Sequence, residues 1–216
     1  GLLNLQTEML LPIDFLKAQK YAPEFTKELE QAMFSCCAQW PKLKGKSVFV
    51  VDVSGSMGAT LSSKSDFNRM DAAAAMAVLA REMCEDVSIY ASSGSDSRGI
   101  HQTALVKDSR GFALSDEILT HGYAGRNSLG GGGIFTRQCL EYIKEREQQV
   151  TRVIVFSDSQ DCDRVNKVPK PFGQYNYIVD VSAHQHGINY NGVWTSEISG
   201  WSESFLKYIS ALEQSL

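Results

Sequence analysis

The sequence predicts an α/β fold: a doubly wound, mostly parallel sheet of the Rossmann type with helices on both faces, preceded by a helical N-terminal segment. Two observations support this. Short apolar runs rich in β-branched residues, at 47–53, 151–158 and 175–183, are typical of strands buried on both faces. Longer segments with apolar residues three and four apart separate them, as in amphipathic helices. Strands that alternate with helices form parallel sheets covered on both sides.

The N-terminal part differs from the rest. Residues 1–22 show no clear period, and we expect an extended arm or the tail of a preceding domain there. A helix is predicted over 23–40, because Pro23 suits a first helical turn, apolar residues follow at helical spacing, and Pro41 ends the pattern. The basic link "KLKGK" follows. We therefore divide the chain into an arm and helix, 1–44, and an α/β domain, 45–216.

The elements of the domain follow in order from the same patterns. The first strand is 47–53, and the alanine-rich segment after it predicts a long helix. Ser115 is expected to cap a short helix. The alanine-rich helix covers 66–86, and the short helix that Ser115 would cap covers 114–122. The other predicted elements are strands 87–92 and 100–106, the helix 136–149, strands 151–158 and 175–183, and a final helix, 202–214.

Composition excludes several classes of protein. The 216 residues suit one domain with a short appendage. A net charge of −4 argues against this segment alone binding a phosphate backbone. No apolar run approaches the roughly 18 residues of a membrane span, so we expect no membrane contact.

The N-terminus has no signal peptide and no initiator Met, which suggests an excised or processed piece. Five cysteines without a CxxC pair predict reduced thiols and a cytoplasmic location.

Oxygen-bearing side chains gather where strands are predicted to end. Asp52, Ser54 and Ser56 follow the first buried strand, and alternate residues of an extended chain point the same way. Thr136 follows the glycine run 130–133, and Asp158 ends another buried strand. Ligands of open α/β sheets bind at this edge. Two carboxylates and three hydroxyls are the ligand chemistry of Mg²⁺ or Mn²⁺.

Simpler interpretations stay open for each part of this set. Asp-x-Ser-x-Ser alone is common in turns, and Thr136 and Asp158 are both suited to capping a helix. The run 130–133 could cradle a phosphate, but it lacks the Gly-Lys-Ser/Thr ending of a P-loop, so a flexible loop is expected. Residues 161–163 are expected to form a solvated loop. The alternate histidines of 184–186 could form a second metal site.

The motifs "DVSGSM", the glycine-rich loop ending in Thr136 and "FSD" resemble the von Willebrand factor A domain and its metal-ion-dependent adhesion site. The resemblance implies that Ser54, Ser56 and Thr136 contact the metal, while Asp52 and Asp158 act through water. It also implies that a carboxylate from a partner protein completes the shell.

A wider resemblance links the chain to the Ro autoantigen (TROVE-type) family, especially its bacterial members. It rests on "GKSVFVVDVSGSM", "AAAAMAVLARE", "GGGGIFT", "VIVFSDSQ" and "YNYIVDVSAH". It implies that 1–44 is a remnant of a helical-repeat region and 45–216 an A domain. In the parent protein, the helical region would bind noncoding Y RNA and misfolded RNA. Two departures are Ile134 and Phe135, which separate the glycines from Thr136, and Ser159, where the family often has Gly.

Three classes of function remain at this point. The preferred one is a metal-dependent binding domain without enzymatic activity. A Mg²⁺-dependent aspartyl-phosphate phosphatase is the alternative enzyme, with Asp52 as nucleophile. However, Ser54 stands where such enzymes carry a second Asp, and no lysine lies in a matching loop. The third is a structural domain with an empty metal site.

Overall fold

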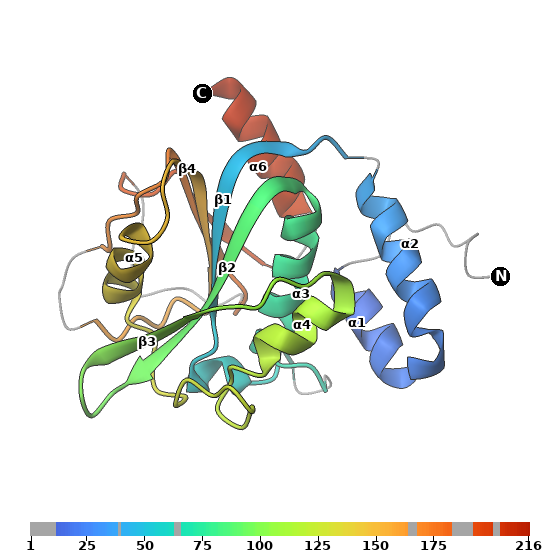
Figure 1. Cartoon of the computed structure of the whole chain (residues 1–216), viewed down its shortest axis with the longest axis horizontal. Coiled ribbons are helices and arrows are strands. Elements are labelled where there is room, and N and C mark those ends of the chain that lie inside the picture. Colours follow the sequence, from blue (N-terminus) through green and yellow to red (C-terminus); the bar gives the residue numbers. More distant parts are fainter. Residues whose placement is uncertain (1–11, 39, 63–65, 164–167, 183–191, 201–203) are drawn as a thin grey trace.

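The computed structural model describes residues 12–38, 40–62, 66–163, 168–182, 192–200 and 204–216. Within this part of the chain, six strands form one sheet in the order β3-β2-β1-β4-β5-β6 (Figure 1). All neighbours are parallel except β2 and β3, which are antiparallel. The strands are β1 (Leu43–Asp52), β2 (Cys84–Ser95), β3 (Ile100–Leu105), β4 (Val150–Ser157), β5 (Tyr175–Asp180) and β6 (Ser196–Ser199).

Helices cover both faces of the sheet, as predicted. Figure 1 shows α5 on one side and α3, α4 and α6 on the other. The α-helices are α1 (Pro12–Tyr21), α2 (Thr26–Ala38), α3 (Arg69–Glu82), α4 (Gly111–Leu119), α5 (Thr136–Lys144) and α6 (Ser204–Ser215). Two short 3₁₀ turns are η3 (Pro23–Phe25) and η4 (Gly55–Gly58).

Alternation along the central strands builds two cores. Phe49 of β1 and Phe156 of β4 belong to the larger core, which α3, α4 and α6 cover. Val50 and Val155 point the other way, into a smaller core beneath α5. Because successive side chains of a strand face opposite sides, a strand covered on both faces must be apolar throughout. This explains the uninterrupted apolar runs.

Several boundaries differ from the sequence prediction. Residues 12–21, expected to be an extended arm, form α1, whose Phe15 joins the larger core. The predicted helix 66–86 ends at Glu82, and Cys84 already belongs to β2. The strand β6 was not predicted. Ser115 is not a cap: α4 begins at Gly111, and Ser115 is buried inside it.

The N-terminal helices pack against the domain. α1 and α2 both contact α3, and Leu29 and Met33 of α2 lie in the larger core. The boundary between 1–44 and 45–216 stays a prediction. Among the described residues, no helix combines the length and the apolar character that crossing a membrane requires.

Candidate metal site

Asp52 is the centre of the polar cluster at the carboxyl end of β1. Its side chain is fully buried. Oδ1 accepts a hydrogen bond from the Ser54 backbone N–H at 2.9 Å, and Oδ2 accepts one from the Ser157 hydroxyl at 2.7 Å. Burial raises the pKa of Asp52 from 3.8 to about 6, although these serine hydrogen bonds oppose the shift. The fold therefore holds a carboxylate where its charge is poorly solvated.

The two motif serines present their hydroxyls side by side. Ser54 precedes η4 and Ser56 lies within it, and their Oγ atoms are 3.2 Å apart. Adjacent oxygens around an octahedral Mg²⁺ are separated by about 3.0 Å when each lies about 2.1 Å from the ion. The observed spacing is thus close to that of two neighbouring ligands, as the alternation from Asp52 predicts.

Asp158 follows β4 and lies beside Asp52. Ser157, the last residue of β4, precedes Asp158 and donates a hydrogen bond to Asp52. The negative charge of Asp158 also contributes to the raised pKa of Asp52. The Asp158 side chain is fully buried. Its Oδ2 accepts a hydrogen bond from Nη1 of Arg69 at 2.8 Å, forming an ion pair. Arg69 is the first residue of α3, and nothing in the sequence pattern indicated that it would reach this site.

Ser159, next in the chain, adopts a left-handed backbone with φ of 59°. Such a conformation favours glycine, which explains why the related motif often has Gly at this position. Ser159 is 8% exposed, and its hydroxyl has no hydrogen-bond partner among the described residues. A buried hydroxyl without a partner beside Asp158 is a further oxygen that a bound ion or water could satisfy.

Thr136 is brought to the same edge by the glycine-rich loop. It is 4% exposed and begins α5. The loop before it packs directly on η4, because a Cβ added to Gly55 would lie 2.7 Å from the Gly131 carbonyl oxygen. The loop is also pinned to β2, since a Cβ on Gly132 would lie 2.4 Å from the Gly94 carbonyl oxygen. These glycines allow the backbone of the loop to approach η4 and β2 closely.

Asp161 and Asp163 cap α5, a role that the sequence analysis missed. Oδ1 of Asp161 accepts a hydrogen bond from the Thr136 backbone N–H at 3.2 Å, and Oδ2 of Asp163 accepts one from that of Arg137 at 2.6 Å. The expectation of a solvated loop is wrong for Asp163, whose side chain is 5% exposed. Thr136 itself is not the N-cap, because that position belongs to Phe135. The Thr136 hydroxyl instead donates a hydrogen bond to the Asp161 carboxylate, which opposes the burial that raises the pKa of Asp161.

The turn at Asp52 has a counterpart at the carboxyl end of β5, two strands away in the sheet. Asp180-Val181-Ser182 repeats the sequence Asp-Val-Ser at the end of β5, and Oδ1 of Asp180 accepts from the Ser182 backbone N–H at 2.6 Å. Aspartate side chains commonly fold back in this way on the residue two positions later. The turn alone therefore does not indicate a metal. What distinguishes Asp52 is the second serine, Ser56, and the adjacent Asp158.

The chemistry of the cluster is limited to hard oxygen ligands. Among the described residues, no three His, Cys, Asp or Glu side chains are grouped so that they could hold a metal. A cation at this edge would depend on the hydroxyls of Ser54 and Ser56, supported by carboxylates. This donor set fits Mg²⁺ or Mn²⁺ and does not fit softer metals. The alternate histidines of 184–186 lie outside the described residues.

Neither the protein-family models nor the curated proteins contain a match to this chain. Among solved structures, the Ro (RSR) protein of Deinococcus radiodurans matches with a TM-score of 0.66 and 17% identity, covering 99% of this chain. The chain spans 47% of that protein's length. An aerotolerance-related membrane protein from Bacteroides fragilis, carrying multiple mutations to serine, matches with a TM-score of 0.44 and 10% identity over 78% of this chain and 96% of its own. The sheet order, the helices on both faces and the likeness to the Ro protein together show a von Willebrand factor A-like fold.

Proposed function

We propose that this domain binds one divalent cation, Mg²⁺ or Mn²⁺, and through it a carboxylate of a partner protein. Ser54, Ser56 and Thr136 would hold the cation, with Asp52 and Asp158 in support. The observation that carries the proposal is the pair of serine hydroxyls 3.2 Å apart, next to two fully buried aspartates. When bound, the cation supplies a positive charge and a coordination position for an external oxygen ligand.

Electrostatics supports a cation at this place. Burying an ionised carboxylate is unfavourable unless an opposite charge or hydrogen bonds compensate. Asp158 has such a charge in Arg69, whereas Asp52 has only serine hydrogen bonds and a raised pKa. A divalent ion beside Asp52 would stabilise its ionised form. Metal binding should therefore weaken as the pH falls below about 6.

The alternative of a phosphatase is less well supported by the geometry. A nucleophilic carboxylate must present one oxygen to its substrate. Both oxygens of Asp52 accept protein hydrogen bonds, and the side chain is fully buried. Ser54 also occupies the position at which a general acid would be needed. We therefore propose a binding function without catalysis.

Calorimetric titration of Mg²⁺ and Mn²⁺ into chelator-treated protein tests the proposal. Asp52→Asn should abolish binding, because it keeps the turn with Ser54 but removes the charge. Asp180→Asn is the matched control, since it makes the same change in the same type of turn on β5, and it should bind like the wild type. A domain with an empty structural site would show no binding by the wild type, and equal binding by wild type and Asp52→Asn would also contradict the proposal.

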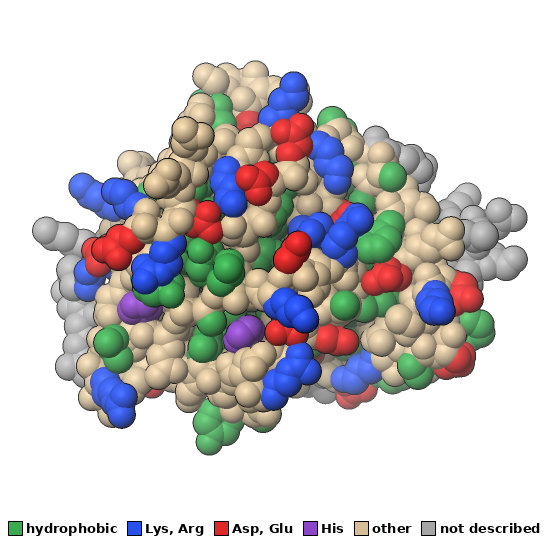
Figure 2. All heavy atoms as spheres, in the orientation of Figure 1, with side chains coloured by type: hydrophobic (Ala, Val, Ile, Leu, Met, Phe, Trp, Pro, Cys, Tyr) green, Lys and Arg blue, Asp and Glu red, His purple; other side chains and the backbone are tan. Residues whose placement is uncertain are grey.

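For the longer parent protein, we propose a Ro-like ribonucleoprotein in the cytoplasm, whose helical region binds noncoding Y RNA. The Deinococcus Ro protein is about twice as long as this chain, which leaves room for such a region. The chain itself is acidic overall, and Figure 2 shows Lys and Arg interspersed with Asp and Glu on the face in view. We expect this chain alone not to shift a Y RNA in a gel assay, while a parent containing the helical region should. Tight binding by this chain alone would contradict the assignment.

A further inference from the structure

The ion pair between Arg69 and Asp158 places a permanent positive charge in the candidate metal site. The guanidinium is 2.8 Å from the carboxylate, the Asp158 side chain is fully buried, and that of Arg69 is 13% exposed. The second oxygen of Asp158 accepts a hydrogen bond from the Gln160 backbone N–H at 3.3 Å. Both oxygens of Asp158 thus have partners within the protein. Any cation at the site must share this carboxylate with Arg69.

The position of Arg69 at the start of α3 holds its side chain against Asp158. Arg69 is the first residue of the helix and lies within a capping box, in which the side chains of Asn68 and Asp71 each accept a hydrogen bond from the other's backbone N–H. The capping box fixes the direction in which α3 starts and so directs Arg69 toward the end of β4.

We propose that Arg69 sets the cation affinity of this site: it is a built-in counter-ion that holds Asp158 when no metal is present and weakens metal binding through charge repulsion. This inference rests on the proposed metal-binding function. A divalent ion that shares the Asp158 carboxylate with a guanidinium would be repelled by its positive charge, and a repulsion of about 1.4 kcal/mol corresponds to about tenfold in affinity. The same charge leaves the metal-loaded site more positive, which favours a carboxylate as the external ligand.

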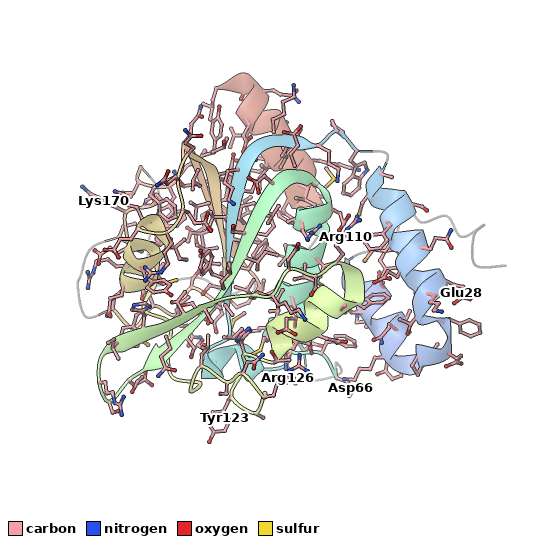
Figure 3. The ribbon with its side chains drawn as sticks, in the orientation of Figure 1. Glu28, Asp66, Arg110, Tyr123, Arg126 and Lys170 are labelled. Carbon is pink, nitrogen blue, oxygen red and sulfur yellow. The ribbon has the colours of Figure 1, made fainter. Side chains whose placement is uncertain are left out.

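The test is the dissociation constant for Mn²⁺ alone, measured by calorimetry and by electron paramagnetic resonance of free Mn²⁺. Arg69→Gln should bind Mn²⁺ about tenfold more tightly than the wild type, and Arg69→Lys, which keeps the charge, should bind within about twofold of it. Arg110→Gln is the matched control. Glu82 is the last residue of α3 and lies about 20 Å from Arg69 along the helix. Arg110 pairs with its buried carboxylate. It should leave Mn²⁺ affinity unchanged (Figure 3 labels Arg110).

The outcomes separate this inference from the function on which it rests. If the wild type binds Mn²⁺ and Arg69→Gln binds it with equal or lower affinity, the role of Arg69 is overturned and the metal site stands. Absence of binding in the wild type and in every variant overturns both. Binding in Arg69→Gln alone supports the inference, because it shows that Arg69 keeps the cation out. If Arg69→Gln does not fold, Asp158→Asn with and without Arg69→Gln gives the same charge difference without a buried unpaired carboxylate.

Discussion

Replacing Asp52 with Asn should change how the stability of the metal-free domain depends on pH. Asp52 is fully buried at the end of β1, and its folded-state pKa is raised from 3.8 to about 6, chiefly by burial. Asn has the same shape and can still accept the hydrogen bond from the Ser54 backbone N–H. The substitution therefore removes the charge with little change in packing.

The magnitude follows from the two pKa values. Each pKa unit between the folded and unfolded states corresponds to about 1.4 kcal/mol in the free energy of unfolding. A carboxyl that titrates near 3.8 in the unfolded state and near 6 in the folded state therefore contributes about 3 kcal/mol more to stability when it is protonated than when it is ionised. The folded state binds the proton more tightly, so this stability is fully present below the unfolded pKa. It is lost as the pH rises through about 6. Asp52→Asn has no such proton, and its advantage over the wild type should grow by about 2–3 kcal/mol between about pH 4 and about pH 8.

Urea unfolding monitored by circular dichroism, with a chelator present, measures this difference at both pH values. The quantity that matters is the change in the gap between wild type and Asp52→Asn, because it cancels the titration of every other group. A gap that is the same at both pH values would refute the reasoning and place Asp52 in a more polar environment than the structure shows. Adding Mn²⁺ near pH 8 at about a hundredfold excess over its dissociation constant should then stabilise the wild type by about 3 kcal/mol and leave Asp52→Asn unchanged.

Three further substitutions test other parts of the structure by the same unfolding measurement. Glu213→Gln should destabilise the protein by about 3–5 kcal/mol, because Arg152 is 2% exposed and donates to both Glu213 oxygens at 2.9 and 2.6 Å; a loss below about 1 kcal/mol would contradict this. Ser159→Gly should stabilise by about 1 kcal/mol, since it relieves the positive φ and removes a buried hydroxyl without a described partner; a clear destabilisation would show that the hydroxyl is used. Gly132→Ala should destabilise by about 1–3 kcal/mol because its Cβ would meet the Gly94 carbonyl oxygen, and a neutral result would mean that the loop moves freely.

Much of the fold could be read from local patterns. The apolar runs that became β1, β4 and β5 are buried on both faces, and only such strands need to be apolar at every position. Other elements lacked this signal. The strand β6, Ser196–Ser199, is short and none of its residues is fully buried, so its pairing with β5 stabilises it more than its composition does. The helix α1 forms in a segment without clear period, where Phe15 packs into the larger core.

The boundary between α3 and β2 shows the same competition. Residues such as Cys84 continue the helical spacing of the alanine-rich segment, and the sequence alone favours a longer helix. In the fold, Cys84 pairs with Leu43 at the start of β1, and the sheet hydrogen bonds outweigh one more helical turn. Propensity is a weak preference, and a strand partner from 40 residues away decides the outcome.

The sequence by itself determined which oxygen-bearing residues gather at the candidate site: Asp52, Ser54 and Ser56 follow a buried strand at alternate positions, a local relation that backbone geometry preserves. Only the tertiary structure decided what surrounds them. Arg69 reaches Asp158 across 89 positions in the chain, and Asp161 occupies the start of α5 from the loop after β4. Such contacts depend on how helices and strands pack and leave no period in the sequence. The net charge of the candidate site is therefore a property of the fold.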